Sequence, residues 1–471
     1  MTESEAHLAR LCRRTFLHLW SYPGLYQDKG KGKTGHGKEL CDLLVVFGND
    51  MLFFSDKHCE LRLDPTPEIG WARWYRKAIV DAANQIASAE RWLASNPSRV
   101  FVDRACSERI PIALPATQRT YRIVTCRGAA KPTAETVGGR GSLIVTNGKL
   151  SEGASAPFHL GAIDEAGRFF HVFDEVALEA LLATFDTATD LCEYLADREE
   201  FFRTYERVVA AGEEELIAFY LRNFSEERGR HCFHVEVEPS TGMPPSAVII
   251  DEGYWDEWLP SAARASKIAA DEVSYCWDRL IEKFSYHVQT ATQDYASPGG
   301  ISVHEVIVRW MAKEPRVRRR MLSRALVGMI HSDKPDTLHR KLILPSQPGD
   351  PYWVLCAFPQ PSFISPAQYR EGRRAVLDSL CRAAKHAQPQ ALDIAGIAIG
   401  PNLAMMSEDL VHLDAREWNE EAAADAAEAS RVMGAFSSDP TFTGVEYEFP
   451  TNAPAMDPGA PAVLQGKRDQ K

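Results

Sequence analysis

The chain has 471 residues, of which 45% are hydrophobic and 25% are charged. These proportions are ordinary for globular proteins and exclude wholesale disorder or a fibrous chain. One hydrophobic core seldom organises so long a chain, so two or three domains are expected. The formal net charge of -12 opposes binding of a polyanion over the whole surface, so any nucleic-acid site must be a local basic patch.

The cysteines and the first residues bear on the compartment. The ten cysteines contain no CxxC pair, and MTESEAHLARLCRR lacks the apolar core of a signal peptide. We therefore expect free thiols and a cytoplasmic protein. No apolar run reaches the length of a membrane span, so no membrane partner is expected. His231, Cys232 and His234 lack a second cluster at zinc spacing, and we interpret them as part of an ordinary strand.

Hydrophobic periodicity and breaker residues predict the secondary structure. The elements predicted in the first 130 residues are a helix at 5–21, a flexible basic loop at 29–38, a hairpin of buried strands at 43–47 and 51–54, a helix at 71–95, and strands at 100–103 and 121–126. The later helices are predicted at 175–184, 187–209, 212–222, 263–290, 302–331, 366–387 and 415–434, and the last strands at 353–358, 394–399 and 409–413.

The basic loop contains part of a phosphate-binding motif. Gly32, Gly37 and Lys38 fit GxxxxGK, but Glu39 stands where the motif needs Ser or Thr to hold magnesium. A P-loop follows a strand and opens a helix, whereas here a helix is predicted before the loop and strands after it. We therefore predict a flexible tether, and a nucleotide-hydrolysing function would require this loop to bind ATP.

The hairpin brings together the charged residues at its open end. Asp42 begins the first strand and Lys57 ends the second. Two registers of a two-residue loop are open: one pairs position 42 with 55, and the other pairs it with 57. Either register puts Asp42, Ser55 and Lys57 on one face, because side chains alternate along a strand. A three-residue loop without a bulge would instead bring Asp56 to that face.

A carboxylate beside a lysine suits metal-assisted hydrolysis of a phosphodiester. Asp42, with main-chain oxygens and waters, could hold Mg²⁺, a hard cation that prefers oxygen ligands. Such a metal stabilises charge on phosphoryl oxygens and lowers the pKa of a bound water. Lys57 could orient or deprotonate that water. The alternative to a catalytic role is that Asp42 and Lys57 form a surface ion pair at an exposed hairpin end.

The pattern of Asp42, a two-stranded hairpin ending in Lys57, and a following helix that carries Gln85 resembles the PD-(D/E)XK nuclease superfamily. The resemblance covers residues 5–130. It implies a core ordered helix, strands, helix, strand, and a phosphodiesterase that uses Mg²⁺ or Mn²⁺ on DNA or, less often, RNA. It also implies that Asp42 binds the metal, that Lys57 is the motif lysine, that Glu39 is an accessory acid, and that Gln85 is the polar residue of the helix.

Ser55 departs from the family pattern, which has Asp or Glu two residues before the lysine. A hydroxyl cannot supply the charge of a carboxylate, so metal affinity would fall unless Glu39, Asp56 or Glu60 compensates. Two explanations remain open. One is ligand migration, which we favour because Glu39 and Asp42 approach the same end of the hairpin. The other is a nuclease fold that has lost its activity.

Two further charged segments have structural interpretations. The run RVRRR at 316–320 could grip a phosphate backbone, but we interpret it as a solvated helix face that meets acidic partners. The acidic helix within 185–202 is likewise predicted to be solvated.

The sequence therefore predicts a metal-dependent nuclease, acting on DNA or, less often, RNA, with Asp42, Glu39 and Asp56 as candidate metal ligands. The alternative is an inactive nuclease-like scaffold that binds nucleic acid or a partner protein. A homodimer and a role in prokaryotic defence would suit this class. The expected fold is α/β, with a restriction-endonuclease-like domain at 1–150, α+β regions at 151–295 and 296–449, and a disordered tail at 450–471.

Overall fold

The structure is a computed structural model of the chain. It describes residues 2–29, 31–225, 227–237, 242–293, 301–334, 336–359, 364–400, 408–436 and 446–450. The predicted tail lies outside these residues, apart from Pro450.

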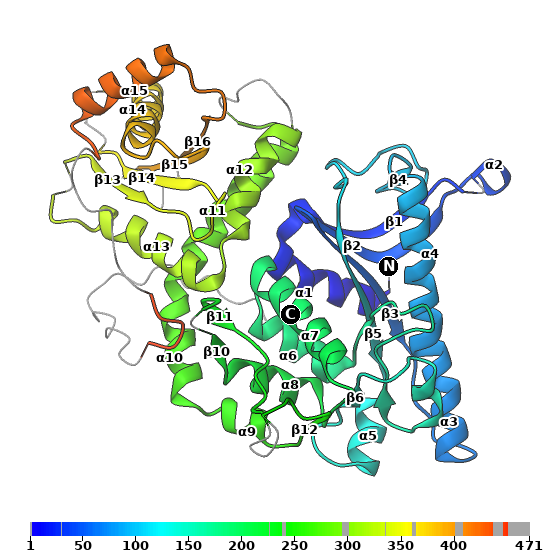
Figure 1. Cartoon of the computed structure of the whole chain (residues 1–471). Coiled ribbons are helices and arrows are strands. Elements are labelled where there is room, and N and C mark those ends of the chain that lie inside the picture. The colour runs from blue at the N-terminus through cyan, green and yellow to red at the C-terminus, as the bar shows by residue number, and fades with distance from the viewer. Residues whose placement is uncertain are drawn as a thin grey trace.

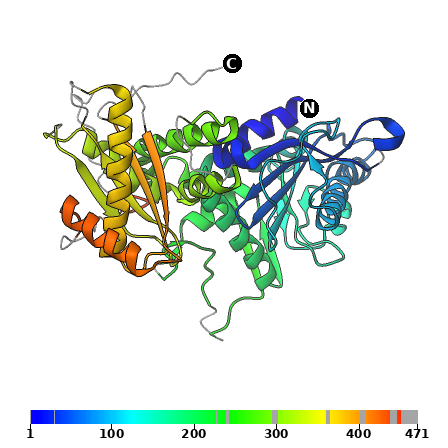
Figure 2. The ribbon, with the colours of Figure 1, turned by 90° about the horizontal axis from the view of Figure 1, so that it is seen from above.

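Helices and mixed sheets make up the chain, so the predicted α/β class is confirmed. The N-terminal sheet lies at one end of the molecule and the C-terminal sheet at the other, and the helices that lie between them include a group in the segment 262–330 (Figures 1 and 2). This group comprises α10 (Ala262–Asp271), α11 (Tyr275–Thr290), α12 (Ile301–Lys313) and α13 (Arg316–Ile330). Within the described ranges, no helix is both long and apolar enough for a membrane span.

The first sheet has six strands in the order β4-β1-β2-β3-β5-β8. Strands β1, β2 and β3 pair antiparallel in succession, whereas β5 and β8 extend the sheet in parallel. A parallel neighbour needs a long crossover, which the helices between β3 and β5 supply. The bounds are β1 (Ser21–Gln27), β2 (Lys38–Phe47), β3 (Asp50–His58), β4 (Val100–Phe101), β5 (Arg119–Arg127) and β8 (His171–Phe173).

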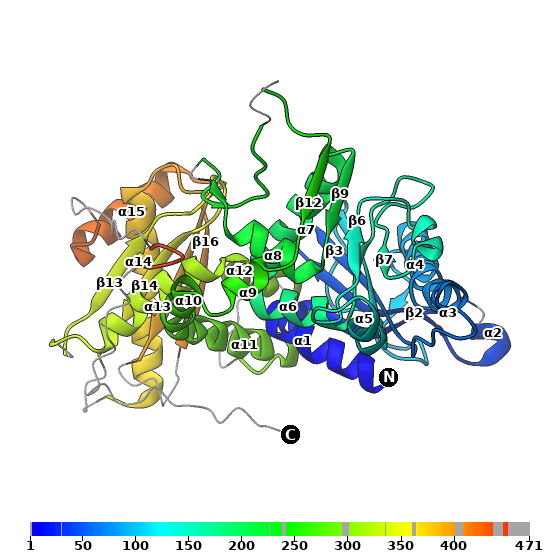
Figure 3. The same ribbon diagram turned by 90° about the horizontal axis from the view of Figure 1, so that it is seen from below.

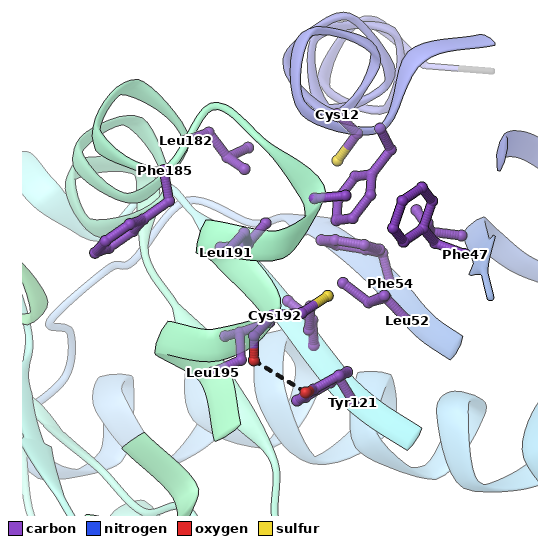
Figure 4. Close-up of a cluster of buried hydrophobic side chains, with 14 of the residues drawn as sticks. Cys12, Phe47, Leu52, Phe54, Tyr121, Leu182, Phe185, Leu191, Cys192 and Leu195 are labelled. Carbon is purple, nitrogen blue, oxygen red and sulfur yellow. Dashed lines mark hydrogen bonds between the residues drawn. The ribbon is translucent and has the colours of Figure 1, made fainter. Parts of the chain in front are cut away.

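Helices cover both faces of this sheet. On one face, Figure 4 shows α1 and the α6–α7 segment packed over Leu52, Phe54 and Tyr121, with the Tyr121 hydroxyl donating to the Cys192 carbonyl at 2.9 Å. Helix α4 packs on the other face. The helices of this region are α1 (Glu3–Trp20), α2 (Lys31–Thr34), α3 (Pro67–Tyr75), a π-helical turn (Arg76–Val80), α4 (Asp81–Ser95), α5 (Ala130–Thr136), α6 (Glu175–Thr184) and α7 (Ala188–Thr204).

The turn between β2 and β3 fixes the register of the hairpin. Phe47 pairs with Asp50 and Leu43 with Phe54, so the loop is Gly48-Asn49 and position 42 stands opposite 55. Gly48 has φ +61°, the sign that the first position of a type II′ turn requires. This is one of the two registers left open by the sequence, and it places Asp42 and Ser55 on the face covered by α4.

A bulge in β2 changes which residues share that face. Leu25 pairs with Cys41 and Tyr26 with Glu39, so Leu40 is an extra residue in the ladder. Without the bulge, Glu39 would lie on the face opposite Asp42, because their spacing is odd. The bulge shifts the alternation and brings Glu39 to the face of Asp42.

A second sheet lies beside the first, in the order β12-β9-β6-β7 (Figure 3). Strands β12 and β9 run parallel, and β6 pairs antiparallel with β9. Its elements are β6 (Ile144–Thr146), β7 (His159–Leu160), β9 (Arg207–Ala210), β12 (Ala247–Ile250), α8 (Glu213–Leu221) and α9 (Tyr254–Trp258). A two-stranded ribbon, β10 (Phe224–Ser225) and β11 (Arg230–His231), completes the middle region.

The C-terminal sheet has the order β13-β14-β15-β16, with β14 and β15 parallel and the outer pairs antiparallel. Its own core lies between the sheet and α14. The bounds are β13 (His339–Ile343), β14 (Tyr352–Ala357), α14 (Pro366–Ala387), β15 (Asp393–Ile399), β16 (Glu408–Asp414) and α15 (Glu420–Met433).

The domain boundaries expected from the sequence do not coincide with the sheets. Strand β8 completes the first sheet although it lies beyond residue 150. The largest hydrophobic core runs from Leu8 to Ile399 and so crosses the boundaries expected at 150 and 295.

Three arginines of α13, Arg316, Arg319 and Arg320, are buried and paired, not solvated as the sequence suggested. Arg316 Nε donates to Asp186 Oδ1 at 2.9 Å, and Arg316 and Arg319 both donate to Asp278 at 2.8 Å. Arg320 donates to Asp271 at 2.6 Å. The expectation of acidic partners is confirmed, while the expectation of a solvated face is wrong. Asp186, at the start of the supposed solvated acidic helix, is one of these buried partners.

Candidate active site at the open end of the hairpin

Four of the predicted site residues meet at the open end of the β2–β3 hairpin. Asp42 comes from β2, Ser55 and Lys57 from β3, and Gln85 from α4. Asp42 Oδ2 lies 3.8 Å from Lys57 Nζ, with the Asp42 side chain 4% exposed and the Lys57 side chain 29% exposed. Ser55 is fully buried and Gln85 is half-buried. The carboxylate and the ammonium therefore point to a common place that solvent reaches from the Lys57 side.

Hydrogen bonds hold the Asp42 carboxylate on both oxygens. Oδ2 accepts from the Asp56 amide at 2.6 Å and from the Ser55 hydroxyl at 3.1 Å. Oδ1 accepts from Gln85 Nε2 at 3.2 Å. A carboxylate has about four lone-pair positions, so a further ligand would approach Oδ1 or displace one of these donors.

Gln85 is oriented by Lys57. Lys57 Nζ donates to Gln85 Oε1 at 2.8 Å, and an ammonium can only donate, so the amide oxygen faces the lysine. Ser55 Oγ lies 3.1 Å from Asp42 and 3.2 Å from the same Gln85 oxygen. Because a hydroxyl carries one proton, Ser55 donates to only one of them at a time. The charged Asp42 is the stronger acceptor.

The pKa of the Asp42 carboxyl is raised above its usual range. Burial is the main cause, and it is opposed by the charge of Lys57 and by hydrogen bonds from Asp56 and Ser55. The charged form of Asp42 is thus only partly compensated by its neighbours. Such sites favour the approach of a cation.

Glu39 is exposed at the start of β2, on the Asp42 face that the bulge gives it. Partial burial of its carboxyl, and then the charges of Asp42 and Glu5, raise the pKa of Glu39. Glu39 and Asp42 are therefore close enough to repel each other.

Glu5, an acid in the first turn of α1, was not among the site residues predicted from the sequence. Its charge raises the pKa of both Asp42 and Glu39. The local pattern TESE indicates only a helix N-cap, in which Thr2 and Glu5 exchange hydrogen bonds. No signal in the sequence could place this cap beside Asp42, because their proximity depends on how α1 packs on the sheet.

Asp56, the third residue proposed as a metal ligand, lies on the opposite face of the sheet. Its Oδ1 accepts from the Thr125 hydroxyl at 2.6 Å and lies 3.5 Å from Arg127 Nε. The register with 42 opposite 55 leaves Asp56 facing away from Asp42. Only its backbone amide contributes to the site.

The donor set fits a metal only in part. In the portions of the chain that the structure describes, no group of three or more His, Cys, Asp or Glu side chains is arranged to hold a metal ion. Mg²⁺, however, keeps several waters and is often held by one or two carboxylates together with substrate phosphates. Asp42 and Glu39 could supply those carboxylates.

The P-loop interpretation fails on geometry. Gly32 lies within the four-residue helix α2, and Lys38 begins β2, so no helix opens at the end of the motif. Strand β1, which was not predicted from the sequence, precedes the loop.

Comparison of the chain with protein-family models, with curated proteins and with solved structures found no match.

Proposed function

We propose that the chain is a divalent-metal-dependent nuclease that hydrolyses phosphodiester bonds of DNA at the Asp42 site. The observation that carries the proposal is the meeting of Asp42, Lys57 and Gln85, from three separate elements, at one place where the Lys57 side chain is partly exposed. A surface ion pair would not require a buried carboxylate whose pKa is raised by burial. The resemblance to PD-(D/E)XK nucleases supports the same reading.

Each residue has a role in this proposal. Asp42 and Glu39 would hold Mg²⁺ or Mn²⁺, which when bound stabilises charge on the phosphoryl oxygens and lowers the pKa of a bound water. Lys57 positions the attacking water and donates to it. Gln85 holds Lys57 in place, since its Oε1 accepts from Nζ and its Nε2 donates to Asp42. Ser55 fixes the Asp42 carboxylate.

The basic loop would help to hold the phosphate backbone. It projects from the body of the molecule at α2 (Figure 1) and leads directly into β2. Lys38 precedes Asp42 by four residues, a span of about 13 Å along a strand. That distance is about two nucleotide steps of a single strand, so lysines of the loop could contact phosphates that flank the scissile bond.

The second candidate is a scaffold without nuclease activity. It is favoured by Ser55, which occupies the position of the motif acid and hydrogen-bonds Asp42 instead of adding a second carboxylate. Such a protein would bind nucleic acid or a partner protein without cutting. A cleavage assay separates the two functions.

The experiment incubates plasmid DNA, linear duplex and single-stranded RNA with the protein in Mg²⁺, Mn²⁺ or EDTA. We expect metal-dependent cleavage of DNA by the wild type, lost in Asp42→Asn and in Lys57→Met. The matched controls are Asp50→Asn, at the turn end of the same hairpin, and Lys131→Met, an exposed lysine. Both should cut as the wild type does. Absence of cleavage with either metal, or cleavage that survives both site substitutions, would reject the nuclease and leave the scaffold.

A further inference from the structure

A cavity lies far along the chain from Asp42, in the middle sheet. It has a volume of about 230 Å³ and is formed at the carboxyl ends of β9 and β12, with α8, α9 and the turn before β6. Figure 3 shows these elements side by side. The two strands are parallel, and each leads into a helix at this end. The carboxyl ends of parallel strands are where α/β sheets commonly bind ligands.

A buried carboxylate with an unused oxygen lines this cavity. Glu214, in the first turn of α8, is 3% exposed. Its Oε1 accepts from the Ser142 hydroxyl at 2.5 Å. Its Oε2 is buried and has no hydrogen-bond partner among the described residues. Burial raises the pKa of the Glu214 carboxyl, and hydrogen bonds from the Ser142 hydroxyl and the Glu214 amide oppose this only in part. A further donor at Oε2 would stabilise the charged form.

The rest of the lining is acidic, and its one cation is already engaged. The lining contains five carboxylates, those of Glu214, Glu215, Asp251, Glu252 and Asp256, and one guanidinium, that of Arg140. Arg140 Nη2 lies 2.5 Å from Asp256 Oδ1, and its charge also acts on Glu214 and Glu215, so one cation faces five acids. Glu215 accepts from the Trp255 amide at 2.9 Å, a hydrogen bond that leaves its charge in place. The cavity therefore attracts a cation.

The walls indicate what kind of cation. Ile144, Val209, Ile249 and Ile250 supply apolar surface beside the carboxylates, and Ile249 is 67% exposed at the rim. A hydrated metal ion would leave this surface in contact with water, whereas a ligand with a hydrocarbon chain would cover it. In the described residues no acidic cluster has the arrangement of a metal site.

We propose that this cavity binds a protonated aliphatic amine, with the ammonium at Glu214 Oε2 and the hydrocarbon chain against Val209 and Ile249. An ammonium offers three donors, enough to engage Oε2 and one of the other carboxylates. The amine could be a small free molecule or the side chain of a lysine, which presents the same group. The site is independent of the nuclease proposal, since it shares none of the residues around Asp42.

The experiment titrates the full chain with methylammonium, n-butylammonium, butane-1,4-diammonium and Nα-acetyl-lysine methylamide, followed by ligand-observed NMR. Neutral n-butanol, Mg²⁺ and Ca²⁺ are the comparison ligands. We expect n-butylammonium to bind more tightly than methylammonium, and n-butanol not to bind. Preference for the diamine would indicate a free amine as the source, and preference for the lysine derivative would indicate a protein side chain.

The variants locate the binding. Glu214→Gln keeps the shape of the side chain and the hydrogen bond from Ser142. It should weaken the binding of n-butylammonium by about tenfold or more, because a hydrogen bond to a charged group is worth about 1.5–3 kcal/mol. Glu257→Gln, an acid of α9 outside the cavity, should change nothing. If Glu214→Gln unfolds, Ile249→Ser serves in its place and should remove the advantage of butyl over methyl. Equal binding by wild type and variants, no binding of any amine, or binding of Mg²⁺ or Ca²⁺ alone would overturn the proposal.

Discussion

The hairpin end around Asp42 and the arginine cluster of α13 both place ionisable groups inside the protein, but they balance the charges differently. In the cluster, Arg316 and Arg319 share Asp278, and Arg316 also reaches Asp186. At the hairpin end, one lysine lies 3.8 Å from a carboxylate that is itself repelled by neighbouring acids.

The pKa shifts express this difference. Burial would raise the pKa of Asp186, but the charges of Arg316 and Lys267 outweigh it and hold that pKa below its usual range. Burial raises the pKa of Asp42, and Lys57 does not compensate. The ionised form of Asp186 therefore stabilises the fold, while the ionised form of Asp42 destabilises it. A site that costs stability is what a function would retain.

The largest expected effect is on stability, at Asp278. Asp278→Asn would leave Arg316 and Arg319 without the carboxylate they share, and breaking a buried ion pair costs about 3–5 kcal/mol. The free energy of unfolding, measured by urea denaturation, should fall by that amount. The matched control is Glu428→Gln, which breaks an exposed pair with Arg431 and should cost far less stability than Asp278→Asn. Equal effects of the two substitutions would show that the cluster is not the structural element described here.

Asp42→Asn should have the opposite sign on stability. Because the folded pKa of Asp42 is raised, the stability contributed by its neutral form is present below the ordinary pKa of an aspartate and is lost as pH rises through the raised value. The amide removes this loss, so the variant should melt at a higher temperature than the wild type at neutral pH, and the difference should close in acid. Cleavage should fall by about a hundredfold or more, since a bound metal supplies several kcal/mol. A lower melting temperature at neutral pH would contradict the assignment.

Ser55→Asp would restore the acid of the family pattern. Without metal, the added carboxylate beside Asp42 should lower stability by about 0.5–3 kcal/mol through like-charge repulsion and burial. With Mg²⁺ in excess the variant should recover about 2–3 kcal/mol, because a ligand that binds only the folded state stabilises it. Thermal melts with and without Mg²⁺ measure both, and Ser55→Asn is the uncharged control. A variant that Mg²⁺ does not stabilise would favour the scaffold.

The smallest effect is expected at Glu39, because its side chain is exposed. Glu39→Gln should weaken Mg²⁺ binding by about two- to fivefold, the worth of an exposed charge. The pKa of Glu39 is raised by partial burial and by Asp42. Its contribution to Mg²⁺ binding should therefore appear at a higher pH than that of an ordinary glutamate. Mg²⁺ titrations of wild type and variant over the acid range would test this. The two curves should converge at low pH, where Glu39 is neutral.

Local signals in the sequence predicted well the elements that are limited by strong helix caps or by a tight turn. The helices expected at 175–184 and 366–387 are α6 and α14 in full. Both begin at strong caps, Asp174 for α6 and the Ser365 capping box for α14. The hairpin was also predicted, because Gly48-Asn49 separates two apolar runs.

Errors arose where tertiary pairing or a break in a helix decided the outcome. The helix expected at 187–209 ends at Thr204, because residues from Arg207 pair with β12 as strand β9. The helix expected at 302–331 divides before Pro315, which caps α13. The helix expected at 263–290 is interrupted by a 3-10 turn, Glu272–Ser274. Strand β1 contains Pro23 and Gly24, which locally disfavour a strand, and it forms because β2 and β4 pair with it.

The sequence by itself determined the α/β class, the hairpin, and the presence of an acid, a lysine and a glutamine at positions that could meet, because alternation and turn chemistry are local properties of the chain. Only the tertiary structure decided the register, the bulge at Leu40 that turns Glu39 toward Asp42, and the separation of Asp56 from the site. It also decided that Arg316, Arg319 and Arg320 are buried counter-ions and that Glu214 lines a cavity. The burial of the charged residues depends on which charges are desolvated together. Burial is set by packing between elements distant in sequence.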